Sequence, residues 1–167
     1  TVIRGPAAVL YPNATLGGIV LTTSRFPLSQ PRYSAMARID QHGSYRGEVD
    51  FTSPLGNVGP LRFSYRLVAA QQGGDTYHKN IHDDRTVVHP TLQMAFKNTV
   101  VRLGYDYHDI KRNGGASGII TPNGKLYTDA GRSESYQPRN NLAKYESSGL
   151  RLFIIQKISD NWDAKIN

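Results

Sequence analysis

Four residues near the middle of the chain have side chains that can bind metal ions. His78 and His82 are four positions apart, and Asp83 and Asp84 follow directly. Histidines at this spacing share one face of a helix and can bind a zinc ion together. Nothing around them predicts a helix, however, because the segment reads as a loop between strands. We therefore predict no metal site.

Residues that could perform nucleophilic or acid–base catalysis do not form a known pattern. Ser117 lies in a stretch that resembles the G-x-S-x-G nucleophile elbow, but Ile119 occupies the position of the last glycine. The absence of cysteine excludes a cysteine nucleophile, a thiolate metal site and a disulfide framework. No paired carboxylates and no Ser-His-Asp arrangement stand out. The chain is therefore predicted not to be an enzyme.

The charge balance favours anionic partners. Among 167 residues, 20 Lys and Arg oppose 13 Asp and Glu, which gives a formal net charge of +7. The segment 111–144 holds six of the basic residues and only two acidic ones, and could attract anions at long range, although an ordinary solvated loop is the alternative. Nucleic acid is not expected as a partner, because the basic residues are scattered and no aromatic RNA-binding motif occurs.

Alternation of apolar and polar residues recurs along most of the chain and predicts the elements that position these side chains. Tyr33, Ala35, Ala37 and Ile39 alternate with more polar residues in the first such stretch. The same period returns in the stretches 45–52, 61–67, 85–96, 101–108, 150–158 and 162–166. About seven strands result, and the short connections predict that most are antiparallel neighbours.

The connections between these strands alternate in length. The connections 53–60, 97–98 and 159–160 are short, whereas 72–84 and 111–147 are long, and only 42–44 breaks the rule. Short turns at one rim and long loops at the other are typical of outer-membrane β-barrels. The alternative is a soluble β-sandwich that binds carbohydrate or another anionic ligand, in which the alternation separates core from solvent. No apolar run approaches the roughly 18 residues of a membrane helix.

The first 30 residues differ in kind from the rest. Gly17 and Gly18 precede a β-branched run and mark a tight turn, and the segment 26–32, with two prolines, reads as an extended linker. We therefore divide the chain into a small unit at 1–30 and a strand series at 31–167. The chain opens without methionine and stops within an alternating stretch, so we expect it to be part of a longer protein.

Several motifs, taken in order, resemble those of one protein family. The run VIRGPAAVLY at 2–11, the run LGGIV at 16–20 and Arg25-Phe26-Pro27 resemble the end of the plug domain of TonB-dependent outer-membrane siderophore receptors. Gly43-Ser44-Tyr45 and the runs DFTSPL at 50–55, YRLVA at 65–69 and PNGKL at 122–126 have counterparts in the strands that follow the plug. The pattern is most similar to hydroxamate-siderophore receptors of the ferrichrome type.

The resemblance implies an all-β fold, a partial antiparallel transmembrane β-barrel of about seven strands, preceded by the C-terminal part of a plug domain. It implies uptake of ferric siderophores across the outer membrane of a Gram-negative bacterium, with no cofactor bound by the protein. The implied partners are the ferric siderophore, the TonB complex, outer-membrane lipid and lipopolysaccharide. Because open sheet edges are unfavourable in lipid, this segment alone is not expected to transport.

Four residues are predicted to contact the ligand. The resemblance aligns Tyr11 with a tyrosine at the plug apex that contacts the iron chelate, although a packing role beside the following proline is the alternative. Tyr107, His108 and Tyr127 lie at or near the rim with the long loops and could also touch ligand. The stretch 113–118 lacks the adjacent aromatic residues of the ferrichrome type, which leaves the identity of the siderophore open.

Six further residues belong to the plug motif. Arg4 and Arg25 align with plug arginines that can pair with carboxylates of the barrel wall in the family. We expect those partners to lie in strands outside this chain, so that both arginines are solvated here. The other four are expected to act through backbone shape alone: Gly5, Pro6, Gly17 and Gly18.

Overall fold

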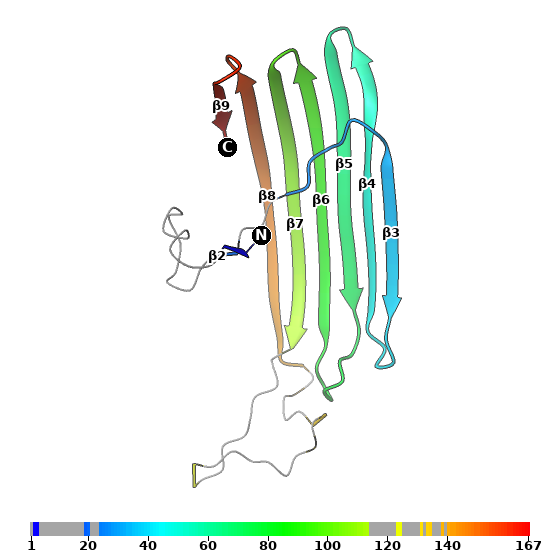
Figure 1. The fold of residues 1–167 in the computed structure, drawn as a ribbon. Coiled ribbons are helices and arrows are strands. Elements are labelled where there is room, and N and C mark those ends of the chain that lie inside the picture. The colour runs from blue at the N-terminus through cyan, green and yellow to red at the C-terminus, as the bar shows by residue number, and fades with distance from the viewer. Residues whose placement is uncertain are drawn as a thin grey trace.

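In a computed structural model, the chain forms one antiparallel sheet of seven strands and, apart from it, a short pair of strands near the N-terminus (Figure 1). The structure describes residues 2–3, 19–20, 24–113, 123, 124, 131, 133, 134, 138 and 140–167. The short pair consists of β1 (Val2–Ile3) and β2 (Ile19–Val20), which run antiparallel with Val2 opposite Val20.

The strands of the large sheet are neighbours in chain order, and each neighbouring pair is antiparallel. They are β3 (Arg32–Ile39), β4 (Tyr45–Val58), β5 (Leu61–Gly73), β6 (Asp83–Phe96), β7 (Thr99–Asn113), β8 (Leu142–Lys157) and β9 (Asp163–Ile166). This order confirms the predicted all-β antiparallel architecture of about seven strands.

Connections of different length lie at opposite ends of this sheet. The connections 59–60, 97–98 and 158–162 lie at the upper end in Figure 1, which we call the turn end. The connection 74–82 and the short turn 40–44 lie at the other end, which we call the loop end, where β7 ends at Asn113 and β8 begins at Leu142. The predicted sorting of connections by length is confirmed, including its one exception.

The predicted connection 53–60 is wrong in extent, because β4 continues through Val58 and the turn consists of Gly59 and Pro60. A bulge between Pro54 and Gly56 shifts the register against β5, and Gly56 adopts a φ of 120° there. The pairing of β4 with β3 ends at Thr52, so Pro54 lies where one edge of β4 is free, a position in which a strand tolerates proline.

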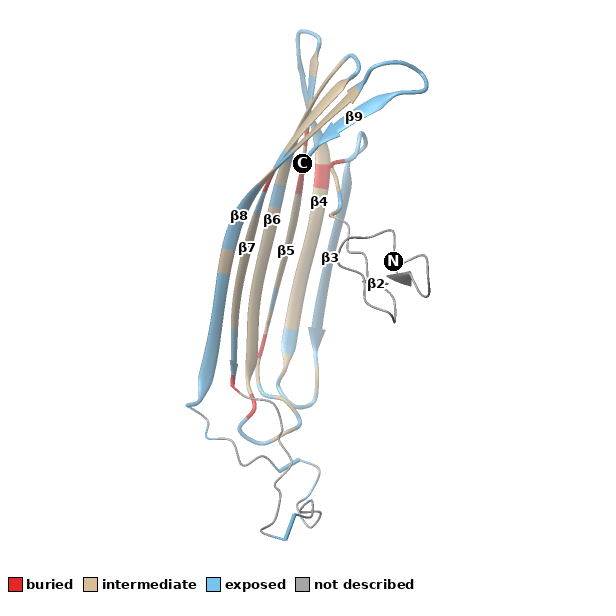
Figure 2. Ribbon diagram, turned by 90° about the vertical axis from the view of Figure 1, so that its left-hand side faces the viewer, coloured by how far each residue is buried: buried red, intermediate tan, exposed pale blue. Residues whose placement is uncertain are grey.

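The two faces of the sheet differ in chemistry. Cross-strand rows such as Leu92, Leu103 and Leu152 form an apolar face, and its side chains are largely exposed, with Ile39 at 79% and Leu150 at 75%. The opposite, polar face carries charged residues of β4, β5, β7 and β8. Figure 2 shows the sheet as a single curved layer.

Burial decides against the sandwich alternative. Two packed sheets bury their apolar faces against each other. In the described part of the chain, Ile81 is the one buried residue of the hydrophobic core, while the buried polar residues are Thr52, Ser64, Arg66 and Asn113. No second sheet covers the apolar face within the described residues. Those same residues include no helix with the length and apolar character to cross a membrane.

The loop end is held together by side-chain hydrogen bonds and by a close backbone contact. Asn113 is fully buried; its side chain accepts a hydrogen bond from the His82 amide and donates one to the Asn80 carbonyl. Gly74 adopts a φ of 111°, and a Cβ at this position would lie 2.3 Å from the carbonyl oxygen of Gly43. The turn 40–44 and the connection 74–82 therefore meet in a contact that has no room for a side chain.

We predict that Gly74→Ala destabilises the protein, because alanine disfavours this φ and its methyl group would overlap the Gly43 carbonyl. The expected loss is about 1–3 kcal/mol, measured by thermal unfolding. The control is Gly149→Ala, since a Cβ at Gly149 meets nothing within 4 Å. Equal unfolding temperatures for the two variants would contradict the prediction.

Candidate functional site

The best-defined cluster of interactions lies where residues 24–31 cross the polar face of the sheet. This crossing segment runs from the level of β8 to the start of β3, over the strands between them (Figure 1). Pro27 and Pro31 favour the extended backbone of this segment. The segment contacts side chains of four strands: Asp50 and Thr52 of β4, Arg66 of β5, Arg102 of β7, and Arg151 and Phe153 of β8.

A buried ion pair holds the middle of the crossing segment. Arg66 donates two hydrogen bonds to Asp50, from Nε to Oδ1 at 2.8 Å and from Nη2 to Oδ2 at 2.7 Å. Its third nitrogen, Nη1, donates to the carbonyl oxygen of Phe26 at 2.8 Å. The side chain of Arg66 is only 7% exposed and that of Asp50 only 14%. Such a bidentate pair is strong and fixes the relative orientation of the two side chains, because both charges are hydrogen-bonded.

Arg25 joins the same carboxylate from the exposed side. Its Nη1 donates to Asp50 Oδ2 at 2.7 Å, while 67% of its side chain remains exposed. The expectation that the partner of Arg25 lies outside this chain is therefore wrong. The carboxylate is that of Asp50 in β4, a strand of the sheet that the crossing segment lies over.

Phe26 anchors the crossing segment by its ring. The Arg102 guanidinium lies 4.0 Å from the ring centroid, and the Phe153 ring meets it edge to face at a centroid distance of 5.8 Å. Two residues further on, the Leu28 amide donates to Thr52 Oγ1 at 3.0 Å. Thr52 in turn donates to the Tyr65 carbonyl at 2.8 Å and is fully buried.

A second charged network lies at the start of the crossing segment. Arg151 donates to Asp106 Oδ1 at 2.6 Å and also to the hydroxyl of Ser24. His89 Nδ1 lies 2.5 Å from the same Asp106 oxygen, and the rings of His89 and His108 are 4.9 Å apart. These side chains line a hollow of about 490 Å³ on the polar face, together with Arg25, Val68 and Thr91.

The structure separates two of the predicted ligand contacts. His108 lies on the polar face and lines this hollow, whereas Tyr107 lies on the apolar face opposite Val88 and Ser148. The Tyr107 hydroxyl lies 3.5 Å from Glu146 Oε1. Neighbours in a strand point to opposite faces, so the two side chains cannot meet one ligand on the same face. The remaining predicted site residues lie outside the described residues: Tyr11, Tyr127, Arg4, Gly5, Pro6, Gly17 and Gly18.

Three of the four residues considered for metal binding form side-chain hydrogen bonds: His82, Asp83 and Asp84. His82 lies between two carboxylates, with Nε2 2.9 Å from Asp84 Oδ2 and Nδ1 3.3 Å from Asp75 Oδ1. The ring of His78 contacts the ring of Tyr77 at a centroid distance of 3.8 Å, with the two planes tilted by 37°. Among the residues that the structure describes, no three His, Asp or Glu side chains are arranged to hold a metal ion.

Sequence reasoning missed most of the contacts of the crossing segment. Asp50, Arg66, Asp106 and Arg151 were recognisable as polar residues on strand faces, but nothing in their order indicates which of them meet. The one local signal is the Arg25-Phe26-Pro27 motif, which marks the crossing segment itself. Its partners are 24–127 positions away in the chain.

Sequence comparison identifies known proteins that are similar to this chain. No protein-family model matches the chain. The chain is 26% identical over 168 residues to the ferric-pyoverdine 358 receptor of Pseudomonas putida, covering 99% of this chain and 20% of that protein. It is 24% identical over 91 residues to the ferrichrome outer membrane transporter/phage receptor of Escherichia coli K12, covering 54% of this chain and 12% of that one. The chain is similar to a segment of these siderophore receptors.

Solved structures of siderophore receptors show the same fold. The ferripyoverdine receptor of the outer membrane of Pseudomonas aeruginosa, bound to ferripyoverdine, superposes with a TM-score of 0.84 at 20% identity, covering 98% of this chain and 22% of that one. The FpvAI–pyocin S2 complex gives the same TM-score, identity and coverage. The chain thus spans about a fifth of the length of these relatives. They are receptors and a transporter, which agrees with the prediction that the chain is not an enzyme.

We predict that Arg66→Met releases the crossing segment, because it leaves the Asp50 carboxylate largely buried with only the exposed Arg25 as partner. Breaking a buried pair in this way costs about 3–5 kcal/mol. Trypsin should then cut rapidly after Arg25, where the wild-type chain resists. Arg62→Met is the control, since Arg62 is an exposed arginine on the same face of the same strand. Similar cleavage of wild type and Arg66→Met would refute the assignment.

Proposed function

We propose that the chain is a wall segment of a TonB-dependent outer-membrane receptor that takes up ferric siderophores. The observation that carries this proposal is the single seven-stranded sheet with an exposed apolar face and a polar face, which matches part of the ferripyoverdine receptor with a TM-score of 0.84. A layer that is apolar outside and polar inside is the design of a barrel wall in lipid.

The distribution of residues along the strands supports a membrane position. On the apolar face, the central rows of β7 and β8 are aliphatic or aromatic, whereas the rows near the loop end hold Asp109, Lys111, Lys144 and Glu146. The strands β4 to β8 are 13–16 residues long, more than the roughly 9–11 needed to cross a bilayer. The loop end therefore extends beyond the bilayer on the extracellular side, where outer-membrane barrels carry their longer loops.

The ligand that we propose is a ferric siderophore, held by the protein without chemistry at the iron. The relatives are named for ferric pyoverdine and for ferrichrome. We propose His108 of the polar face as a contact residue, together with Tyr11 and Tyr127, and we do not extend this role to Tyr107 on the opposite face. TonB, outer-membrane lipid and lipopolysaccharide are the further proposed partners. We also propose that residues 1–30 are the end of a plug domain. The crossing segment would then be the part of the plug that meets the barrel wall.

Uptake of iron by cells tests the proposed function directly. The complete gene is expressed in a Gram-negative strain that lacks its own siderophore receptors, and radioactive iron is supplied as ferripyoverdine or as ferrichrome. We expect the protein in the outer-membrane fraction and uptake that requires TonB. A protein in the soluble fraction, or an outer-membrane protein that takes up neither chelate nor any other ferric siderophore of a broad panel, would reject the function.

We predict that the two faces tolerate charge differently. Leu67→Arg places a cation on the apolar face, where it costs about 2–4 kcal/mol near the middle of the bilayer. Ala70→Arg is the control, because Ala70 lies three residues further along β5 on the polar face, opposite Glu48. The amount of folded protein in the outer membrane, measured by its resistance to unfolding in SDS, should fall for Leu67→Arg alone. Equal amounts of the two variants would contradict the assignment of the faces.

A further inference from the structure

Three arginines lie in one cross-strand row of the polar face near the loop end. Arg38 of β3 is directly opposite Arg46 of β4, and Arg46 is opposite Gln72 of β5, which is in turn opposite Arg85 of β6. Like charges directly opposite each other on neighbouring strands are destabilising unless something neutralises them. The row therefore calls for negative charge near each guanidinium.

Two of the three arginines have that negative charge within the chain. Arg46 pairs with Glu48 through Nε, and its Nη1 donates to Gln72 Oε1 at 2.7 Å. Arg85 forms a two-pronged pair with Asp83, at 3.1 Å from Nε to Oδ1 and 2.9 Å from Nη2 to Oδ2. Within the described residues, no carboxylate lies at ion-pair distance from Arg38, whose side chain is exposed. The row thus retains one uncompensated positive charge.

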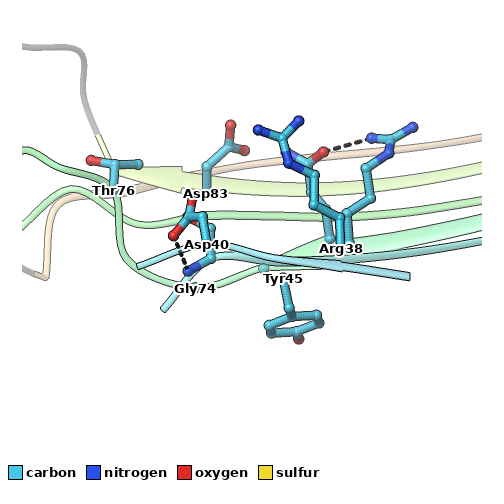
Figure 3. A pocket seen from close by; sticks show the side chains of 10 residues that line it. Arg38, Asp40, Tyr45, Gly74, Thr76 and Asp83 are labelled. Atoms are coloured by element: carbon cyan, nitrogen blue, oxygen red, sulfur yellow. Dashed lines mark hydrogen bonds between the residues drawn. The ribbon is translucent and has the colours of Figure 1, made fainter. Parts of the chain in front are cut away.

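Arg38 lies at the edge of a hollow of about 190 Å³ (Figure 3). The other residues that line it come from the turn 40–44 and from the loop-end parts of β4, β5 and β6 and the connection 74–82: Asp40, Ser44, Tyr45, Arg46, Gln72, Gly73, Gly74, Thr76 and Asp83. Figure 3 shows the side chains of Arg38 and Asp83 on one side of the sheet and the Tyr45 ring on the other. The charged side chains of Arg38 and Asp83 therefore lie on the polar face and not on the apolar face that we assign to lipid.

The acidic residues of the hollow are already engaged. Asp40 Oδ1 accepts hydrogen bonds from the His42 amide at 2.8 Å and the Ser44 amide at 3.1 Å, and the bond from His42 above all keeps the pKa of Asp40 below its usual range. Asp83 forms an ion pair with Arg85. Neither carboxylate pairs with Arg38, so an anion finds a guanidinium there with several N–H donors.

We propose that this hollow is a binding site for a carboxylate group of an incoming anionic ligand, with Arg38 as the residue that contacts it. The site deepens the proposed function, on which it rests, since it assigns a carboxylate-bearing ferric chelate as the class of ligand. A carboxylate accepts two parallel hydrogen bonds from a guanidinium, so it neutralises Arg38 in the same way that Glu48 and Asp83 neutralise the other two arginines.

Chemical modification of arginine tests the site without any iron chelate. The complete protein in detergent is treated with phenylglyoxal, and adducts at individual arginines are followed by mass spectrometry. We expect Arg38 to react quickly and millimolar citrate to slow its modification about fivefold, by occupancy of the site. Arg32 serves as the internal control, because it lies on the same face of the same strand opposite Thr52 and outside the hollow. No protection of Arg38 by citrate, or protection by inorganic phosphate alone, would overturn the proposal.

Iron uptake by variants separates this site from the proposed function. For a carboxylate-bearing ferric chelate that the wild type transports, Arg38→Ala should raise the concentration for half-maximal uptake about tenfold, while Arg32→Ala leaves it unchanged. Arg38→Lys keeps the positive charge but loses the two parallel N–H donors, so its concentration for half-maximal uptake should lie between those of the wild type and Arg38→Ala. Normal uptake by Arg38→Ala would overturn the site and leave the receptor function standing. A wild type that transports no ferric chelate would reject the function. The protection of Arg38 by citrate would still test whether the hollow binds a carboxylate.

Discussion

The geometry of the polar face depends on one buried ion pair, between Arg66 and Asp50. All three guanidinium nitrogens of Arg66 are used, two on the carboxylate and one on the backbone of Phe26. Because a buried charge cannot remain without a partner, the pair fixes the distance between the sheet and the segment that crosses it. Phe26 then reaches Arg102 and Phe153, and Ser24 reaches Arg151. The pair therefore lies between the contacts that the two ends of the crossing segment make with β4 and β8.

Most of the sheet could be predicted from the sequence, because the period of two is a local property. It identified the strands, their antiparallel order and the sorting of long and short connections. It failed at 53–58, where Pro54 and Gly56 look like a turn but form a bulge at a free strand edge. Proline and glycine report only local backbone preferences, and whether a neighbouring strand needs their N–H groups is decided by the rest of the sheet.

The candidate site was less predictable, because its contacts join residues that are far apart in the chain. The pattern shows which face each side chain lies on, and alternation alone could have separated Tyr107 from His108. It does not give the register between strands, which puts Arg38 opposite Arg46, nor the path of residues 24–31. For the same reason the partner of Arg25 was expected elsewhere, although Asp50 lies within the same sheet.

The chain-order arrangement of the strands has a consequence for how the wall is assembled. Each strand pairs only with its neighbours in sequence, so the sheet can grow one hairpin at a time, and every connection except 74–82 and 114–141 is short. The bond between Ser24 and Arg151 spans 127 positions and cannot form until β8 has joined. The crossing segment can therefore bind to β4 and β5 before it binds to β8. All of its contacts are present only when this part of the sheet is complete.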